Sequence, residues 1–164
     1  IRRILSIAIQ KDDDVILICE DDHGFTKHYS KELFLRCLIQ AGNRGCDILI
    51  GGVSGGFNHC IFAHDNLVIV DAFWGTQFMV IFKHMFQRIL SYSFRDFDTA
   101  DGVLSTIAHN KMVFFPFVSI QKDFGYSDII DSNYINRPDV STLFRSATER
   151  LDNISAARSK LHYK

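Results

Sequence analysis

The sequence predicts a single α/β domain with a central, mostly parallel sheet. Apolar runs of strand length alternate along the chain with segments whose apolar residues recur at helical spacing. The longest early run, Val15–Cys19, has five consecutive apolar residues, which is typical of a strand buried on both faces of a parallel sheet. A chain of 164 residues can bury one core, and no internal repeat divides it. We therefore expect one domain over residues 1–164.

Composition narrows the class of protein. Hydrophobic residues make up 47% of the chain and charged residues 23%, which is typical of a globular protein. The net charge of −1, without any basic run, gives no reason to expect a nucleic-acid partner, and no apolar stretch has transmembrane length. The four cysteines lack CxxC spacing, so we expect reduced core thiols in a cytoplasmic protein.

The first third of the chain predicts two helices around the Val15–Cys19 strand. Residues 1–8 form an amphipathic pattern with Ile4, Leu5 and Ala8 on one face, and we expect further residues upstream of Ile1. Residues 30–41 also have helical spacing, with Ser30 as the expected N-cap and Gly42 as the end of the helix.

The middle of the chain predicts three more strands. Residues 47–50 form a short buried strand that leads into a glycine-rich stretch at 51–56. This stretch has neither Walker nor Rossmann spacing, so we expect a loop beside the site. Residues 60–63 and 67–73 are expected to pair as a hairpin around residues 64–66.

The last part of the chain continues the alternation. A strand is expected at 78–82, helices at 83–90 and 100–108, and a polar and aromatic loop between these helices at 92–99. Pro116 interrupts an apolar run at 112–118, so this is either an edge strand or a strand that ends there. Residues 119–129 are expected to be a loop. A final helix is expected at 140–157, capped by Asp139 or Ser141.

Three adjacent acids, Glu20, Asp21 and Asp22, follow the Val15–Cys19 run. Ligands of open α/β sheets bind beyond the carboxyl ends of strands, so a site is expected here. Adjacent carboxylates repel one another, and a divalent metal that itself holds a phosphate is the simplest neutralising partner. The alternative is that the acids cap a following helix or face water.

Several segments occur in an order that resembles glycosyltransferase family 25, which includes bacterial lipo-oligosaccharide galactosyltransferases and is similar to the collagen galactosyltransferases. The resemblance covers roughly residues 4–130. It depends on Ile18-Cys19-Glu20-Asp21-Asp22 with Phe25, Asp47-Ile48-Leu49, Gly75-Thr76, Asp101 with Leu104, and Gln121 with Ser127-Asp128-Ile129. It implies a three-layer fold of the GT-A type, as in nucleotide-diphospho-sugar transferases. We expect this chain to lack the N-terminal unit that holds the nucleotide base in the family.

The resemblance also implies a reaction. A hexose, galactose in the typical case, would move with inversion from a UDP-galactose-like nucleotide-diphosphate donor to a saccharide acceptor. Mn²⁺ or Mg²⁺ would assist, because the leaving diphosphate develops negative charge. The expected setting is the biosynthesis of lipopolysaccharide or another cell-surface polysaccharide. The protein would then work in the cytoplasm, at the inner face of the membrane when the acceptor is lipid-linked.

The acids receive roles within this interpretation. Glu20 and Asp22 are the expected metal ligands, because alternate residues of an extended segment point to the same side. Asp21 is left for hydroxyls of the donor's ribose or sugar. His23, which replaces an apolar residue of the family, is either a further ligand or a hydrogen-bonded neighbour. Asp101 is the expected general base, although an acid at a helix N-terminus is stabilising without any catalytic purpose.

The remaining candidates are expected to hold the donor or the acceptor. Gly75 and Thr76 let the backbone approach a ligand, or form a simple turn before a strand. Gln121, Ser127 and Asp128 are expected to line the site, with turn capping as the alternative for Asp128. Three aromatic residues either stack on the acceptor sugar or are buried: Phe57, Phe73 and Trp74.

Two other functions remain open. A non-catalytic protein of this fold would bind carbohydrate or nucleotide without transfer. A metal-dependent phosphohydrolase also uses carboxylates after a strand, and would hydrolyse nucleotide sugars without an acceptor.

Overall fold

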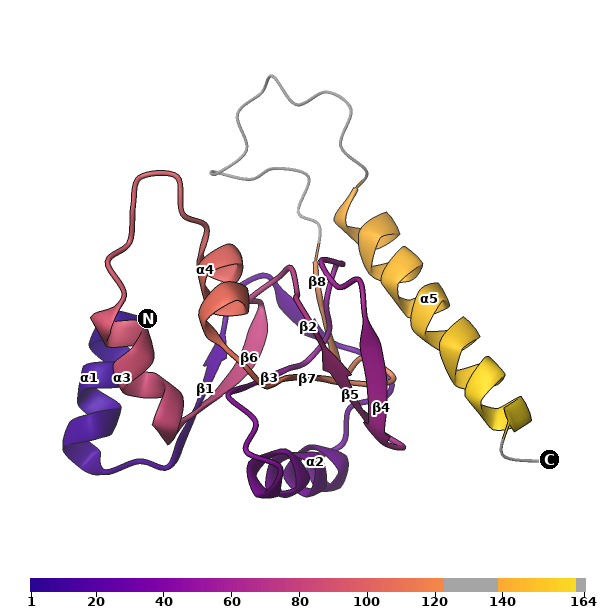
Figure 1. The fold of residues 1–164 in the computed structure, drawn as a ribbon, viewed down its shortest axis with the longest axis horizontal. Helices are drawn as coiled ribbons and strands as arrows, with labels where there is room; N and C mark the ends of the chain where they lie inside the picture. Colours follow the sequence, from indigo (N-terminus) through magenta and orange to yellow (C-terminus); the bar gives the residue numbers. More distant parts are fainter. Residues whose placement is uncertain (123–138, 162–164) are drawn as a thin grey trace.

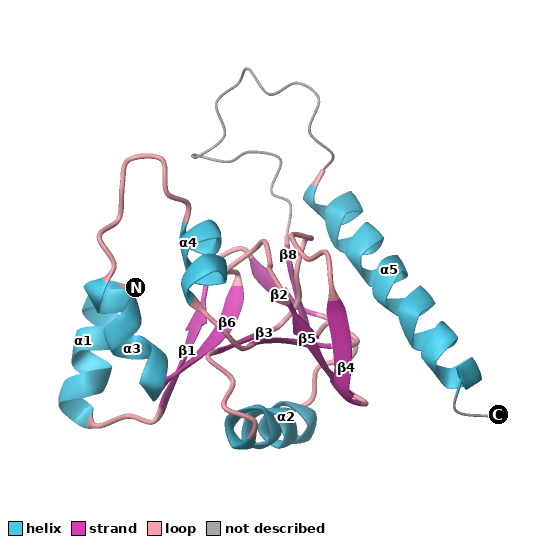
Figure 2. Cartoon of the chain, in the orientation of Figure 1, coloured by secondary structure: helices cyan, strands magenta, loops and turns pink. Residues whose placement is uncertain are grey.

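The computed structural model describes residues 1–122 and 139–161, in which a mixed β-sheet lies between helices (Figures 1 and 2). The helices are α1 (Arg2–Lys11), α2 (Lys31–Asn43), α3 (Lys83–Ser91), α4 (Ala100–Ile107) and α5 (Val140–Leu161). The strands are β1 (Val15–Cys19), β2 (His23–Phe25), β3 (Ile48–Ile50), β4 (Cys60–His64), β5 (Leu67–Val70), β6 (Phe78–Phe82), β7 (Lys111–Phe114) and β8 (Ser119–Gln121). The predicted α/β class is confirmed.

The main sheet has the strand order β1-β6-β3-β7-β5-β4 and is mostly antiparallel. Four of its five neighbouring pairs are antiparallel, and the β3–β7 pair is parallel. The prediction of a mostly parallel sheet is therefore wrong. Strand β6 runs in reverse between β1 and β3, and the predicted β4–β5 hairpin adds two antiparallel pairs at the other side. Apolar runs arise here because helices cover both faces, whatever the strand direction.

Strand β1 lies at the edge of this sheet, paired with β6 alone. We expected Val15–Cys19 to be buried inside the sheet, and this is wrong. Ile16 and Ile18 pack against the core on one face, whereas Leu17 on the other face is 47% exposed. The alternation of side chains along a strand explains the difference, because only one face of β1 is well covered.

The core has two parts, one on each face of the sheet. Strand β3 contributes to both, because Ile48 and Ile50 point to one face and Leu49 to the other. The larger part packs α1, α3, α4 and α5 against the sheet, and the smaller part packs α2. Figure 1 shows α2 below the sheet, α1 and α3 to the left of the sheet, α4 above β6 and α5 to the right of the sheet.

Several predicted helix ends are confirmed. Ser30 caps α2 by accepting a hydrogen bond from the Leu33 N–H (3.1 Å), but the helix continues past Gly42 to Asn43. Asp139 caps α5 by accepting a hydrogen bond from the Thr142 N–H (2.8 Å). Where the sequence left two alternatives at Pro116, β7 is a central strand that ends just before the proline.

Two short strands were not predicted. Residues 119–121 were expected to be loop, but they form β8, which pairs antiparallel with β2. Three residues are too few to show an alternating pattern, so the sequence carried no strand signal there.

The four cysteines are free, as predicted, but they are not all core residues. Cys37 and Cys46 are buried, Cys60 is half-buried and Cys19 is exposed. Burial raises the pKa of the Cys46 thiol to about 12, so this side chain stays protonated. Within the described part of the chain, no helix has the length and apolar character needed to cross a membrane.

A buried carboxylate at the start of β3 ties helices to the sheet. Asp47 is 4% exposed and accepts hydrogen bonds from the backbone N–H groups of His109 and Asn110 and from the Arg88 guanidinium. His84 Nε2 lies 2.8 Å from its other oxygen. Burial acts to raise the pKa of Asp47, but these hydrogen bonds and the Arg88 charge outweigh it, so the pKa lies below its usual value.

We expect Asp47→Asn to lower the free energy of unfolding at neutral pH by about 1–3 kcal/mol, because an amide NH₂ would face backbone donors. The charged Asp47 stabilises the fold above its unfolded pKa of ~3.9, and this contribution is lost as the pH falls through the lower folded pKa. Urea titrations should therefore show the difference between parent and variant shrinking below pH ~4. Asp65→Asn, at an exposed turn, is the control. A pH-independent difference would contradict the prediction.

Candidate functional site

The segments that follow β1 and β3 and precede β6 meet at one edge of the main sheet. Both β1 and β3 are antiparallel to β6, so they run in the same direction, and their carboxyl ends lie beside the start of β6. The Glu20 N–H donates to the Gln77 carbonyl (3.0 Å), and the Gly51 N–H donates to the Phe78 carbonyl (2.9 Å). This edge therefore gathers the acids after β1 and the Gly75-Thr76 pair before β6.

The acids after β1 lie in a turn. The His23 N–H donates to the Glu20 carbonyl (3.3 Å), which closes a turn over Asp21 and Asp22. Our reasoning that an extended segment points Glu20 and Asp22 to the same side is therefore wrong. Glu20 and Asp21 are exposed, whereas Asp22 is half-buried.

Gly75 and Thr76 connect two of the predicted carboxylates. The Thr76 hydroxyl donates to Glu20 Oε1 (2.5 Å), and the Gly75 N–H donates to Asp101 Oδ2 (3.2 Å). Two neighbouring residues thus hold Glu20, at the end of β1, and Asp101, in the first turn of α4. The structure brings these four predicted site residues together.

Position 75 requires glycine for two reasons. Its φ angle of +104° lies in a region that other residues rarely adopt, and a Cβ atom would lie 2.8 Å from Gln77 Oε1. The backbone at this position can therefore pass close to its neighbours and present its N–H to Asp101.

Asp22 and Gln121 are also brought together. Gln121 Nε2 donates to Asp22 Oδ2 (2.6 Å), and the Lys122 N–H donates to the Asp22 carbonyl (2.7 Å). Pairing of β2 with β8 places His23 opposite Gln121, which explains how residues a hundred positions apart meet. Asp22 Oδ1 is buried and has no hydrogen-bond partner among the described residues.

Asp101 uses both carboxylate oxygens at the start of α4. Oδ1 accepts from the Gly102 N–H (2.8 Å), Oδ2 accepts from the Gly75 N–H, and Thr99 caps the helix. An anionic side chain in this position stabilises the N-terminus of a helix. Each oxygen keeps a further lone pair, so the arrangement leaves both the catalytic and the structural interpretation open.

Two polar residues at this edge were not predicted. Gln77 is fully buried, and its Nε2 donates to the Gly52 carbonyl (2.8 Å), while its Oε1 has no partner among the described residues. Ser119 Oγ lies 3.3 Å from His23 Nδ1, which favours the hydrogen-bonded alternative for His23. A glutamine directly before an apolar strand was the available signal for Gln77.

The other candidates are more dispersed. Phe57 and Phe73 are buried, so the burial alternative holds for them, whereas Trp74 is 54% exposed. Asp21 is exposed in its turn. Ser127 and Asp128 lie outside the described residues.

The chemistry of the donor atoms fits Mn²⁺ or Mg²⁺. Carboxylate oxygens are hard ligands, and Mg²⁺ is commonly held by one or two carboxylates together with phosphate oxygens of the substrate. Glu20 and Asp22 supply such carboxylates, and the unpartnered Asp22 Oδ1 is an acceptor that a cation would satisfy. Among the described residues, no three His, Cys, Asp or Glu side chains are grouped to hold a metal by themselves. Phosphate oxygens would therefore have to complete the coordination.

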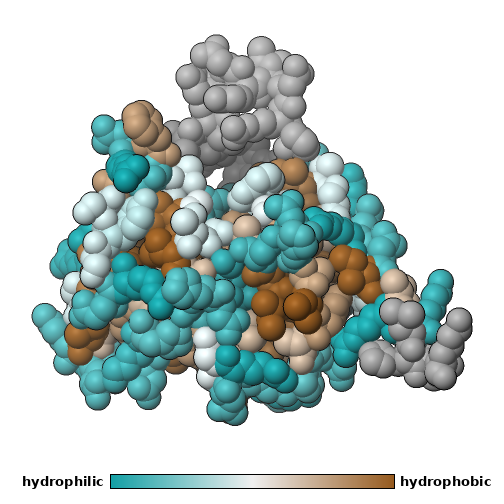
Figure 3. Space-filling model, in the orientation of Figure 1, coloured by the Kyte–Doolittle hydropathy of each residue, from teal (hydrophilic) through white to brown (hydrophobic). Residues whose placement is uncertain are grey.

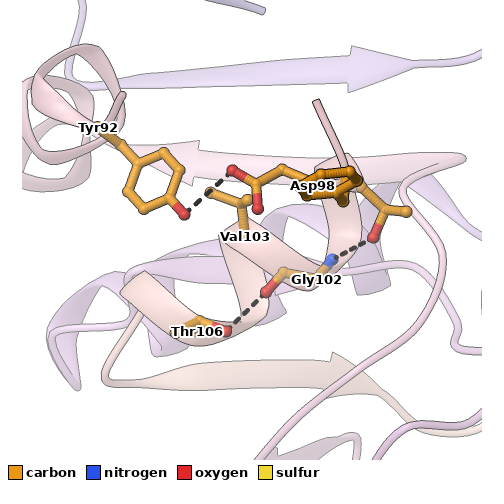
Figure 4. Close-up of a pocket in the computed structure, with 7 residues that line it drawn as sticks. Tyr92, Asp98, Gly102, Val103 and Thr106 are labelled. Atoms are coloured by element: carbon orange, nitrogen blue, oxygen red, sulfur yellow. Dashed lines mark hydrogen bonds between the residues drawn. The ribbon is translucent and has the colours of Figure 1, made fainter. Parts of the chain in front are cut away.

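A second feature lies beside α4, where an open depression of about 290 Å³ is bordered by the end of α3 and the loop that follows it (Figure 4). It is lined by Tyr92, Phe97, Asp98, Thr99, Gly102, Val103 and Thr106. The sequence predicted a polar and aromatic loop here but no site.

Comparison with known proteins adds no assignment: no protein-family model matches the chain, and no curated protein matches it either.

Proposed function

We propose that this protein is a metal-assisted glycosyltransferase that moves a hexose, galactose in the first instance, from a nucleotide-diphosphate donor to a saccharide acceptor. One observation carries the proposal. Glu20, Thr76, Gly75 and Asp101 come from three distant parts of the chain, yet hydrogen bonds join them at the edge of the sheet where β1 ends. These are residues on which the resemblance to glycosyltransferase family 25 depends.

The directions of the strands and the placement of the helices support the same proposal. Strands β1, β3 and β7 run in one direction, and helices cover both faces of the sheet. We include a three-layer arrangement of the GT-A type in the proposal on this basis. The strand β6, which runs in reverse between β1 and β3, delivers Gly75 and Thr76 to the same edge as the acids.

The roles follow from position and charge. Glu20 and Asp22 would hold the metal, with Thr76 fixing the Glu20 carboxylate and Gln121 fixing Asp22. A bound Mn²⁺ or Mg²⁺ would neutralise the charge that develops on the leaving diphosphate. Asp21, exposed beside them, would accept hydrogen bonds from donor hydroxyls.

Asp101 would accept the proton of the acceptor hydroxyl as that oxygen attacks the anomeric carbon. The backbone N–H groups of Gly75 and Gly102 hold its carboxylate in place. Such fixed orientation is what a general base needs, because it must stay within hydrogen-bond reach of the hydroxyl.

A second candidate function is binding without transfer, of carbohydrate or nucleotide. The geometry of Asp101 favours this second function. Both carboxylate oxygens of Asp101 already accept hydrogen bonds from backbone N–H groups at the start of a helix. In that case the sheet edge would bind the ligand without a base.

Calorimetric titration with UDP and UDP-galactose, with and without Mn²⁺, tests the proposal. We expect Mn²⁺ to raise the affinity for both nucleotides, because the diphosphate and the two carboxylates share one cation. If neither nucleotide binds in the presence of Mn²⁺, the proposal is wrong. Nucleotide binding without transfer to any saccharide would favour the binding protein. Hydrolysis of UDP-galactose without an acceptor would indicate a phosphohydrolase instead.

A further inference from the structure

The depression beside α4 lies on a different side of that helix from Asp101. Its lining residues Thr99, Gly102, Val103 and Thr106 are spaced three, four and seven positions apart, so they share one face. Asp101 is two positions before Val103, which places it roughly 160° around the helix, where it contacts Gly75. The depression is therefore separate from the cluster of carboxylates at the sheet edge.

One wall of the depression is a carboxylate held in a fixed position. Asp98 Oδ2 accepts hydrogen bonds from the Tyr92 hydroxyl (3.2 Å) and the Arg95 N–H (2.8 Å). Figure 4 shows the Tyr92 hydroxyl pointing at this carboxylate across the depression. Asp98 Oδ1 makes no hydrogen bond within the described part of the chain, so it can accept one from a ligand.

Two hydroxyls on α4 have spare hydrogen-bonding capacity as well. Thr106 Oγ1 donates to the Gly102 carbonyl (2.8 Å) and can still accept, whereas Thr99 Oγ1 accepts from the Gly102 N–H (3.3 Å) and can still donate. The depression thus offers a donor and acceptors at its polar side.

The apolar side of the depression includes one aromatic ring that is almost fully exposed. Phe97 is 92% exposed, and the half-buried Tyr92 and the buried Val103 complete this side. In the space-filling view, apolar atoms lie at the tip of the loop between α3 and α4 and beside α4, among hydrophilic neighbours (Figure 3). A ligand with one apolar face and one polar edge could contact both the exposed aromatic ring and the fixed carboxylate beside it.

We propose that this depression binds one sugar unit of the saccharide acceptor. Among the described residues, the lining includes the anionic Asp98 and no cation, so the site suits a neutral ligand better than phosphate. A pyranose ring would place its apolar C–H face on Phe97, and one of its hydroxyls would donate a hydrogen bond to Asp98 Oδ1. This inference rests on the proposed function, and it adds that the acceptor is an oligosaccharide. The width of α4, about 10 Å with its side chains, separates the bound unit from Asp101, so a neighbouring unit would carry the reacting hydroxyl.

Amide-resolved NMR titrations test this inference, with the methyl β-glycosides of galactose, glucose and N-acetylglucosamine as probes. We expect at least one probe to shift the amide signals of Thr99, Gly102 and Val103. Phe97→Ala should weaken that binding roughly tenfold, the equivalent of a lost aromatic contact of about 1.4 kcal/mol. It should not affect folding, because the ring is exposed. Ile61→Ala, on β4 and outside the lining, is the control for loss of an exposed apolar side chain (67% exposed) and should stay within about twofold of the parent.

The opposite results are equally clear. Absence of shifts at these amides with all three glycosides overturns the inference, and so do equal effects of Phe97→Ala and Ile61→Ala. Choline serves as a further probe, because an aromatic ring beside a carboxylate also suits a cation. Shifts with choline and none with the glycosides would overturn the sugar assignment. UDP titration with Mn²⁺ on the parent separates the two proposals: nucleotide binding without glycoside shifts would overturn this inference and leave the proposed function standing.

Discussion

Asp22→Asn is expected to remove most of the Mn²⁺-dependent affinity for UDP while leaving the fold intact. The variant loses the charge of a half-buried carboxylate whose Oδ1 has no partner among the described residues. An amide in its place cannot neutralise a cation. Loss of one charged partner from such a site costs roughly 2–4 kcal/mol, which corresponds to roughly 30- to 1,000-fold in affinity. Calorimetry of UDP binding with and without Mn²⁺ measures this directly.

The fold should tolerate this change, because the asparagine carbonyl oxygen can still accept the hydrogen bond from Gln121 Nε2. We expect the free energy of unfolding to change by no more than about 1 kcal/mol. Asp13→Asn is the matched control, because it removes the same charge from an exposed residue at the far end of β1. If Asp22→Asn binds UDP and Mn²⁺ as the parent does, Asp22 is not a metal ligand.

The sequence was a good guide to elements and a poor guide to strand direction. Helices α2, α3 and α4 were predicted from their apolar spacing, because one face of each packs on the sheet. The run Phe78–Phe82 was predicted as a strand, but its side chains are apolar on both faces, so the pattern reads the same in either direction. The direction of a strand depends on the end of the sheet to which its connecting segments lead. That depends on the path of the whole chain and not on the pattern of one strand.

The candidate site shows a similar division. The acids after β1 and the Gly75-Thr76 pair were predicted as site residues, and hydrogen bonds bring Glu20 and Thr76 together. The turn over Asp21 and Asp22 was not predicted although aspartate and the nearby Gly24 favour turns, because the acids were interpreted as metal ligands on an extended segment. Gln77 was missed because its importance depends on Gly52, which follows a different strand.

Asp101 links the sheet edge to α4, so a substitution of Asp101 affects both its contact with Gly75 and the start of the helix. Asp101→Asn keeps the shape of the side chain but places an NH₂ against the N–H of either Gly75 or Gly102. One of these hydrogen bonds is lost, and we expect the free energy of unfolding to fall by about 1–2 kcal/mol. If Asp101 is the general base, turnover should also fall by roughly two to four orders of magnitude, because an amide cannot take up the proton.

Donor affinity separates the interpretations of Asp101. A base contacts the acceptor hydroxyl and not the diphosphate, so the affinity for UDP with Mn²⁺ should stay within a few-fold of the parent. A structural Asp101 predicts near-normal turnover with the same loss of stability. A displaced Gly75-Thr76 pair predicts weaker UDP binding, because Thr76 then releases Glu20. UDP affinity, single-turnover transfer and unfolding should be measured on one preparation, with exposed Asp65→Asn as the control for charge. Turnover within a few-fold of the parent would remove Asp101 from the mechanism.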